Sequence, residues 1–135
     1  MEGTWPPSSF RTTETFRVAT ERVLHDFATT GAIILGRGAA VVLREVPHVM
    51  HVRLDGPQER RSLQAMRLLH IDRRTAEVQL RNADSREAYV RHWYNTDPRD
   101  PGPYHLMIDS TSIMLDACID VIALAAASRR ASIPD

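Results

Sequence analysis

The stretch Ala-Ile-Ile-Leu-Gly-Arg-Gly at residues 32–38 decides which fold we expect. A second run, His-Val-Met-His-Val-Arg-Leu, follows at 48–54. The first run is wholly apolar up to its glycine, and the second is rich in β-branched residues. These features are typical of short strands that are buried on both faces of a parallel sheet. We therefore expect strands at 32–36 and 48–54, with a short helix at 39–44 between them.

Helical patterns surround these two runs. Apolar residues recur at helical spacing between Thr13 and Gly31, which predicts an amphipathic helix there. The residues of this stripe are Phe16, Ala19, Val23 and Phe27. The other expected elements are helices at 57–69 and 73–94, a loop at 95–103, a third strand at 104–109 and a last helix ending near Ala127. We expect Asp72 to cap the helix at 73–94, and Thr111 or Ser112 to cap the last one.

Helices that alternate with short buried strands predict an α/β domain with about three parallel strands flanked by helices. The length of 135 residues suits one such domain, which we place at 13–127. Glycine, prolines and serines dominate the start of the chain, so residues 1–12 are expected to form a disordered arm. Residues 128–135 are expected to be a frayed tail.

The composition excludes several kinds of chemistry. All 17 basic residues are arginine, so no phosphate-loop lysine and no Schiff-base lysine exists in these residues. The 17 acidic residues balance them, which gives no general attraction to nucleic acid or to an anionic membrane. Cys118 is the only cysteine, and no apolar run approaches the ~18 residues of a membrane span, so we expect a cytoplasmic protein. The six histidines form no ligand pair at helical spacing, and no metal site is expected.

Arg37 stands between Gly36 and Gly38 at the end of the first expected strand. Ligands of open α/β sheets bind beyond the carboxyl ends of the strands, and glycines let the backbone come close to a ligand. A guanidinium can hold a phosphate through two parallel hydrogen bonds. Arg37 is therefore a candidate phosphate-binding residue. The alternative is an arginine that only holds a helix end or a neighbouring carboxylate.

The segment 57–94 carries eight arginines against five acidic residues, which leaves three positive charges in excess. These arginines are Arg60, Arg61, Arg67, Arg73, Arg74, Arg81, Arg86 and Arg91. Such a helical pair is often a solvated face with pairs four residues apart. It could also close over phosphates as a lid, or follow a nucleic-acid backbone with Trp93 and Tyr94 stacking on bases.

Four motifs occur in order along the chain: Gly-Ala-Ile-Ile-Leu-Gly-Arg-Gly-Ala-Ala at 31–40, His-Val-Arg-Leu-Asp-Gly-Pro at 51–57, Tyr-Val-Arg-His-Trp-Tyr at 89–94 and Tyr-His-Leu-Met-Ile-Asp-Ser-Thr at 104–111. In this order and spacing the chain resembles the cytidylate-kinase-like family of P-loop nucleoside monophosphate kinases. The resemblance implies transfer of the terminal phosphoryl group of ATP to a nucleoside monophosphate such as CMP, with Mg²⁺.

The resemblance also implies roles for particular residues. Arg37, with Gly36 and Gly38, resembles the turn that holds the acceptor monophosphate. Arg81 and Arg86 resemble catalytic lid arginines that meet the transferring phosphate. Arg91 resembles a further lid arginine and is counted with the substrate-binding residues.

The chain departs from the family pattern in ways that affect fold and activity. The family's phosphate loop and the strand before it would precede residue 14, where there is no room for them. The expected fold is therefore an incomplete three-layer sandwich without its central strand, and we expect this chain alone to be inactive. ATP and Mg²⁺ are implied by the family only. Gly38 stands where cytidylate kinases have aspartate, so the preferred base stays open.

Without the central strand, the strands at 32–36 and 48–54 would each present an unpaired edge. The two strands could pair with each other, or a partner chain or second copy could fill the gap. Direct pairing is expected for the isolated chain. The main alternative to a kinase relative is a non-catalytic protein that binds another protein or has kept only nucleotide binding. Nucleic acid and membrane are not expected partners.

Overall fold

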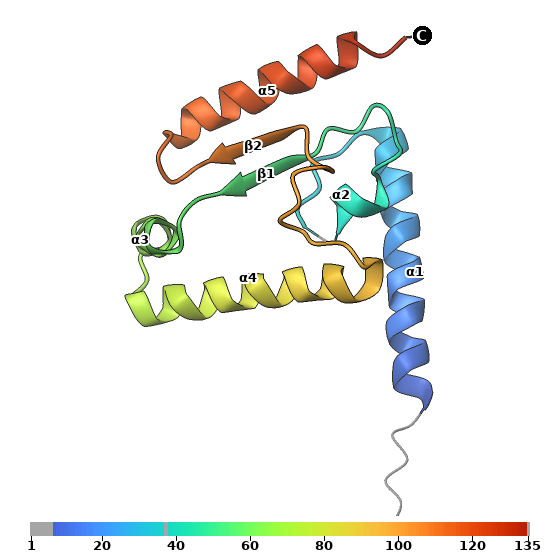
Figure 1. The fold of residues 1–135 in the computed structure, drawn as a ribbon, viewed down its shortest axis with the longest axis horizontal. Coiled ribbons are helices and arrows are strands. Elements are labelled where there is room, and N and C mark those ends of the chain that lie inside the picture. Colours follow the sequence, from blue (N-terminus) through green and yellow to red (C-terminus); the bar gives the residue numbers. More distant parts are fainter. Residues whose placement is uncertain (1–6, 37, 135) are drawn as a thin grey trace, which may run out of the picture. The chain divides into compact units, whose positions relative to one another are not determined.

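The computed structural model describes residues 7–36 and 38–134, with side chains from residue 14 on. Its elements are α1 (Pro7–Thr30), α2 (Ala39–Val42), β1 (Val52–Asp55), α3 (Gln58–Leu69), α4 (Arg73–Tyr94), β2 (Leu106–Asp109) and α5 (Leu115–Ala131), shown in Figure 1. The chain divides into two units, Met1–Val46 and Pro47–Asp135, and each unit is described by itself.

The first unit consists of α1 and α2. The start of α1 at Pro7 agrees with the preference of proline for the first helical position. Residues 1–6 of the expected arm lie outside the described residues. Among the residues of this unit whose side chains are described, Leu24 of α1 and Leu43 after α2 are buried. The predicted apolar stripe of α1 is not buried, because Phe16, Val23 and Phe27 are about half exposed.

The prediction of a strand at 32–36 is wrong. Residues 32–36 follow α1 without regular structure, and the side chains of Ile33 and Leu35 are almost fully exposed. An apolar run becomes a strand only when a neighbouring strand takes up its backbone hydrogen bonds, and no described residue does this here. The expected pairing of this segment with residues 48–54 is therefore also absent from the part of the chain that the structure describes.

The second unit contains one parallel pair of strands. β1 pairs with β2 in a register that sets Val52 beside Leu106 and Asp55 beside Asp109. Two of the three expected parallel strands are thus confirmed, and the α/β class with them, but the neighbour of β1 is β2. In Figure 1 this pair lies between α5 and α4.

The ends of α4 follow from local chemistry. The Asp72 carboxylate accepts a hydrogen bond from the backbone N–H of Thr75 at 2.8 Å, which confirms the predicted N-cap. At the other end Asn95 takes a left-handed conformation with φ 47°. The small side chains of Ser62 on α3 and Ala76 on α4 are fully buried, which lets these two helices pack closely.

The prediction that Thr111 or Ser112 caps α5 is wrong. Thr111 and Ser112 instead turn back onto the end of β2, where the backbone N–H of Thr111 donates to Asp109 Oδ1 at 3.0 Å. The helix begins only at Leu115 and continues to Ala131, so part of the expected tail at 128–135 is helical. Cys118 is buried on the side of α5 that packs on the strands. Among the described residues, no helix has the length and hydropathy that crossing a membrane requires.

Candidate functional site

Both strands of the pair end in an aspartate at the same edge of the sheet. Asp55 and Asp109 lie side by side in the register of β1 and β2. This edge is where parallel α/β sheets bind ligands. Each carboxylate has its own partners: Asp109 Oδ2 accepts from Arg60 at 2.6 Å, and Asp55 Oδ1 accepts from the backbone N–H of Gly56 at 2.9 Å. The pairing with donors offsets the repulsion between the two charges.

Asp109 is held in its ionised form by the residues that follow it. The hydroxyl of Thr111 donates to Oδ1, the same oxygen that accepts from the Thr111 backbone. The Thr111 hydroxyl, its backbone N–H and the charge of Arg60 together hold the pKa of Asp109 below its ordinary value. Asp109 is therefore a fixed anion that orients Arg60 at the strand ends.

Gly56 lets the two strand ends come this close together. Its φ of 150° is a conformation that side chains rarely adopt. A Cβ atom at this position would lie 2.6 Å from Thr111 Cγ2 and 2.9 Å from Asp109 Oδ1. Glycine at this position is therefore required for both conformation and space.

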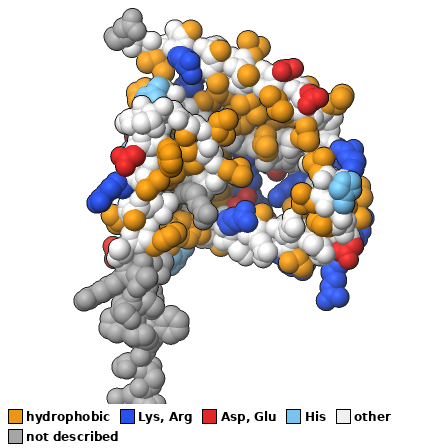
Figure 2. Space-filling model, turned by 180° about the vertical axis from the view of Figure 1, so that it is seen from behind, with side chains coloured by type: hydrophobic (Ala, Val, Ile, Leu, Met, Phe, Trp, Pro, Cys, Tyr) orange, Lys and Arg blue, Asp and Glu red, His pale blue; other side chains and the backbone are white. Residues whose placement is uncertain are grey.

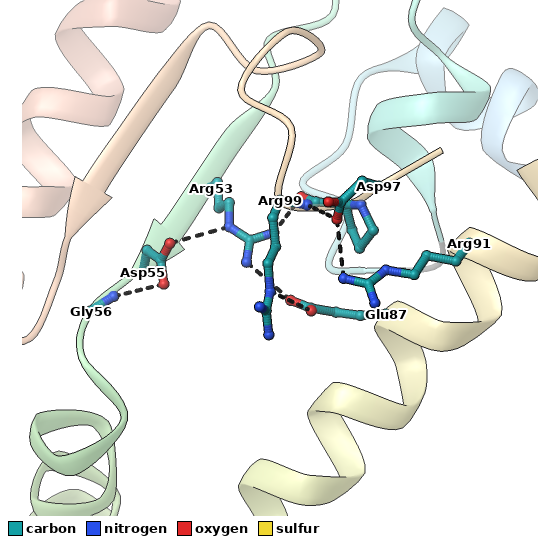
Figure 3. A network of polar contacts seen from close by, with 8 residues as sticks. Arg53, Asp55, Gly56, Glu87, Arg91, Asp97 and Arg99 are labelled. Atoms are coloured by element: carbon teal, nitrogen blue, oxygen red, sulfur yellow. Dashed lines mark hydrogen bonds and ion pairs between the residues drawn. The ribbon is translucent and has the colours of Figure 1, made fainter. Parts of the chain in front are cut away.

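A cluster of arginines lies between β1, the last turns of α4 and the loop that precedes β2, and we call it the arginine cluster: Arg53, Arg91 and Arg99 with Glu87 and Asp97 (Figure 3). Arg53 projects from β1, donates to Glu87 Oε1 of α4 at 3.0 Å and to the carbonyl of Pro98, and contacts Asp55 Oδ2 at 3.5 Å. Burial works to lower the pKa of Arg53, but hydrogen bonds to Glu87 and Tyr104 outweigh it and the pKa is raised. Arg53 is a permanent cation that joins β1, α4 and the loop.

The other two arginines of the cluster are open to solvent. Arg91 of α4 donates to Asp97 Oδ1 at 3.1 Å, and Arg99 of the loop lies 3.6 Å from Glu87 Oε2. The backbone N–H of Arg99 also donates to Asp97, and this bond is the first cause that lowers the pKa of Asp97. The side chains of Arg91 and Arg99 are 50% and 66% exposed. Three guanidinium groups thus meet three carboxylates, those of Asp55, Glu87 and Asp97, and two of the guanidinium groups are largely exposed to solvent.

The predicted site residues are only partly brought together. Arg91 belongs to the arginine cluster. Arg81 and Arg86 are exposed on α4 and pair with no described residue, and a helix places side chains five positions apart roughly 140° from each other. Gly36 and Gly38 have the positive φ values of 72° and 67° that suit a tight turn, but they belong to the first unit. Arg37 lies outside the described residues.

Several residues of this region were not singled out from the sequence. They are Arg53, Asp55, Arg99 and Asp109. Two of them could have been found from their position in the sequence. Asp55 directly follows one expected strand, Asp109 ends another, and turn residues come after each. Arg53 had no such signal, since its partner Glu87 lies on a different element.

Within the described ranges no three histidine, cysteine or acidic side chains lie close enough to hold a metal. Both oxygens of Asp109 already accept hydrogen bonds from Arg60 and Thr111. The sequence has no lysine, and so no glycine-rich loop that ends in lysine for the phosphates of ATP.

A parallel strand pair flanked by helices defines the class of the second unit, an α/β arrangement. The model of the cytidylate kinase-like family matches residues 4–112, and the chain belongs to this family. Comparisons with curated proteins and with solved structures give no match.

Proposed function

We propose that this chain binds the phosphate of a nucleoside monophosphate such as CMP at the arginine cluster, and that it does not transfer phosphoryl groups by itself. Membership of the cytidylate kinase-like family supports a nucleotide as ligand. The observation that carries the proposal is that Arg53, Arg91 and Arg99 come from three different elements and converge on Glu87 and Asp97.

The geometry allows a phosphate to enter without breaking the fold. Arg53 is the least exposed of the three arginines and keeps its bonds to Glu87 and Pro98. The contact of Arg99 with Glu87 is long, at 3.6 Å, and exposed ion pairs of this kind contribute little, about 0–1 kcal/mol. Arg91 and Arg99 can therefore turn to a phosphate and form charge-assisted hydrogen bonds with it.

Phosphoryl transfer needs more than these residues. It depends on phosphate-loop amides, a lysine and a metal ion that together neutralise the developing charge. Since the sequence contains no lysine, we propose binding without turnover. We keep Arg37, with Gly36 and Gly38, as a proposed contact to the acceptor monophosphate. We keep Arg81 and Arg86 as proposed lid residues. Both assignments depend on the family resemblance alone.

Thermal unfolding of the full chain with and without CMP tests the assignment. CMP is expected to raise the melting temperature of the wild-type chain, and Arg91→Gln or Arg99→Gln is expected to weaken CMP binding by roughly tenfold or more. Arg74→Gln is the matched control, because Arg74 is an exposed arginine of the same helix without a partner among the described residues. Equal stabilisation of all four proteins by CMP would overturn the proposed site.

A coupled assay tests the absence of turnover. The purified chain with CMP, ATP and Mg²⁺ is expected to form no ADP above the rate without protein. Turnover that depends on the chain would show that the residues present suffice for catalysis.

A second candidate function is protein interaction without catalysis. Large apolar side chains remain exposed in the second unit, among them Leu54 at 55%, Met114 at 77% and Leu124 at 73%. A defined complex that forms equally well without nucleotide would support this function.

A further inference from the structure

The helix α5 has two faces of different character. The face toward the strands holds Cys118, Ile122, Ala125 and Arg129, and Arg129 donates to the carbonyl of Val49 at 3.0 Å. The opposite face, which we call the outer face, holds Asp116, Ile119, Ala123, Ala127 and Arg130, all of them exposed. Beside it Leu124 is 73% exposed, and Ile119 itself is 62% exposed. Figure 2 shows hydrophobic side chains gathered over the upper part of the molecule, where α5 lies.

We propose that the outer face of α5 docks antiparallel against the same face of a second copy of this chain. Its residues are spaced three, four, four and three positions apart, so the pattern reads the same from either end, with Ala123 at its centre. A two-fold axis at Ala123 sets Ile119 of one copy opposite Ala127 of the other. Such an interface, in which both copies use the same patch, is the commonest form of protein dimer.

The charges of the outer face favour this occupant. Asp116 and Arg130 are exposed, and neither pairs with a described residue. The same two-fold axis sets Asp116 of each copy opposite Arg130 of the other, with Asp120 one helical turn away. The interface thus contains two opposite-charge pairs at its ends and small alanine side chains at its centre, where the helices can approach closely. A second copy of the chain supplies this match residue by residue.

A single substitution at the centre gives the first test. The full wild-type chain is expected to form dimers in sedimentation velocity at micromolar concentration, with or without CMP. Ala123→Glu places a charge and extra volume on the axis and is expected to leave monomer only. Ser128→Glu is the matched control, since Ser128 is an exposed residue of α5 outside the outer face, and this variant is expected to dimerise like the wild type.

Charge reversal gives a second test that does not depend on packing. Asp116→Arg alone sets arginine against arginine twice, and Arg130→Asp alone sets aspartate against aspartate twice, so each variant is expected to dimerise at least roughly tenfold more weakly than the wild type. A mixture of the two variants restores both opposite-charge pairs and is expected to give the heterodimer in native mass spectrometry. A wild-type chain that stays monomeric at 100 µM or so, a dimer that survives Ala123→Glu, or a mixture without heterodimer would each overturn the proposal.

Discussion

His105 and His51 join the starts of the two strands. The backbone N–H of the buried His51 donates to Nδ1 of His105 at 2.9 Å, and the two rings stack with centroids 5.3 Å apart. Loss of solvation, and then the charge of Arg129 on α5, hold the pKa of His105 below its ordinary value. The fold therefore requires the neutral ring of His105, with an unprotonated Nδ1 that accepts this hydrogen bond.

This arrangement predicts a loss of stability in mild acid. The pKa of His105 is lower in the folded chain than its unfolded value of about 6.5, so its contribution is present above pH ~6.5 and declines as the pH falls toward the folded pKa. His105→Asn keeps an acceptor at the position of Nδ1 but does not titrate. Urea unfolding at pH 7.5 and 5.5 is expected to show a smaller pH difference for this variant than for the wild type.

His25→Asn is the control for this measurement, because His25 is an exposed residue of α1. It is expected to keep the pH dependence of the wild type. If His105→Asn also kept that dependence in full, the hydrogen bond from His51 would have no role in it.

Gly56 predicts a large cost for a single methyl group. Gly56→Ala combines an unfavourable φ with a contact of 2.6 Å to Thr111, and is expected to lower the free energy of unfolding by about 2–4 kcal/mol. Gly102→Ala is the control, since the nearest atom there is a side-chain oxygen of Asp100 at 3.3 Å. Equal denaturation midpoints for the two variants in urea would contradict the close approach of the strand ends.

Arg53 and Glu87 couple β1 to α4 at the scale of elements. Their side chains are only 15% and 26% exposed, and the pair is part of a network with Asp55 and Arg99. A double-mutant cycle with Arg53→Met and Glu87→Gln is expected to give a coupling of about 1 kcal/mol or more in urea unfolding. The same cycle on the exposed pair Arg73–Glu59 is expected to show no measurable coupling. A coupling of zero for both pairs would mean that Arg53 does not tie these elements together.

Local signals in the sequence predicted the elements that local chemistry decides. The helix predicted at 57–69 follows from composition, and the helix at 73–94 follows from the capping side chain of Asp72. The structure confirms both, as Gln58–Leu69 and Arg73–Tyr94, together with the cap. The run at 32–36 carried an equally clear apolar signal, yet it forms no strand because strand formation depends on a neighbour. The predicted cap of α5 is wrong for a similar reason, because Thr111 forms its hydrogen bond with Asp109 at the end of β2.

The candidate site was less accessible to prediction than the fold. Arg91 was singled out through its place in a motif, and the structure gives it a partner at Asp97. Arg53 and Glu87 are 34 positions apart, and nothing in either local sequence indicates that they meet. Clusters built by tertiary packing have no short-range pattern, whereas caps and turns have one.

The molecule as a whole belongs to the cytidylate kinase-like family, yet its charge is balanced and its basic residues are all arginine. A neutral molecule attracts anions only through a local group of charges. The arginine cluster is such a group in the second unit, and the proposed role of the chain as a nucleotide-binding protein depends on it. Affinity for CMP should therefore come mainly from the phosphate and should fall as salt rises.

Isothermal titration calorimetry of the full chain with CMP and with cytidine, at low salt, tests this most directly. Binding of CMP, no detectable binding of cytidine, and loss of the CMP signal in the Arg91→Gln, Arg99→Gln double variant are the predicted results. Equal binding of CMP by the wild type and the double variant, or no binding of CMP by either, would contradict the assignment of the arginine cluster as a phosphate site.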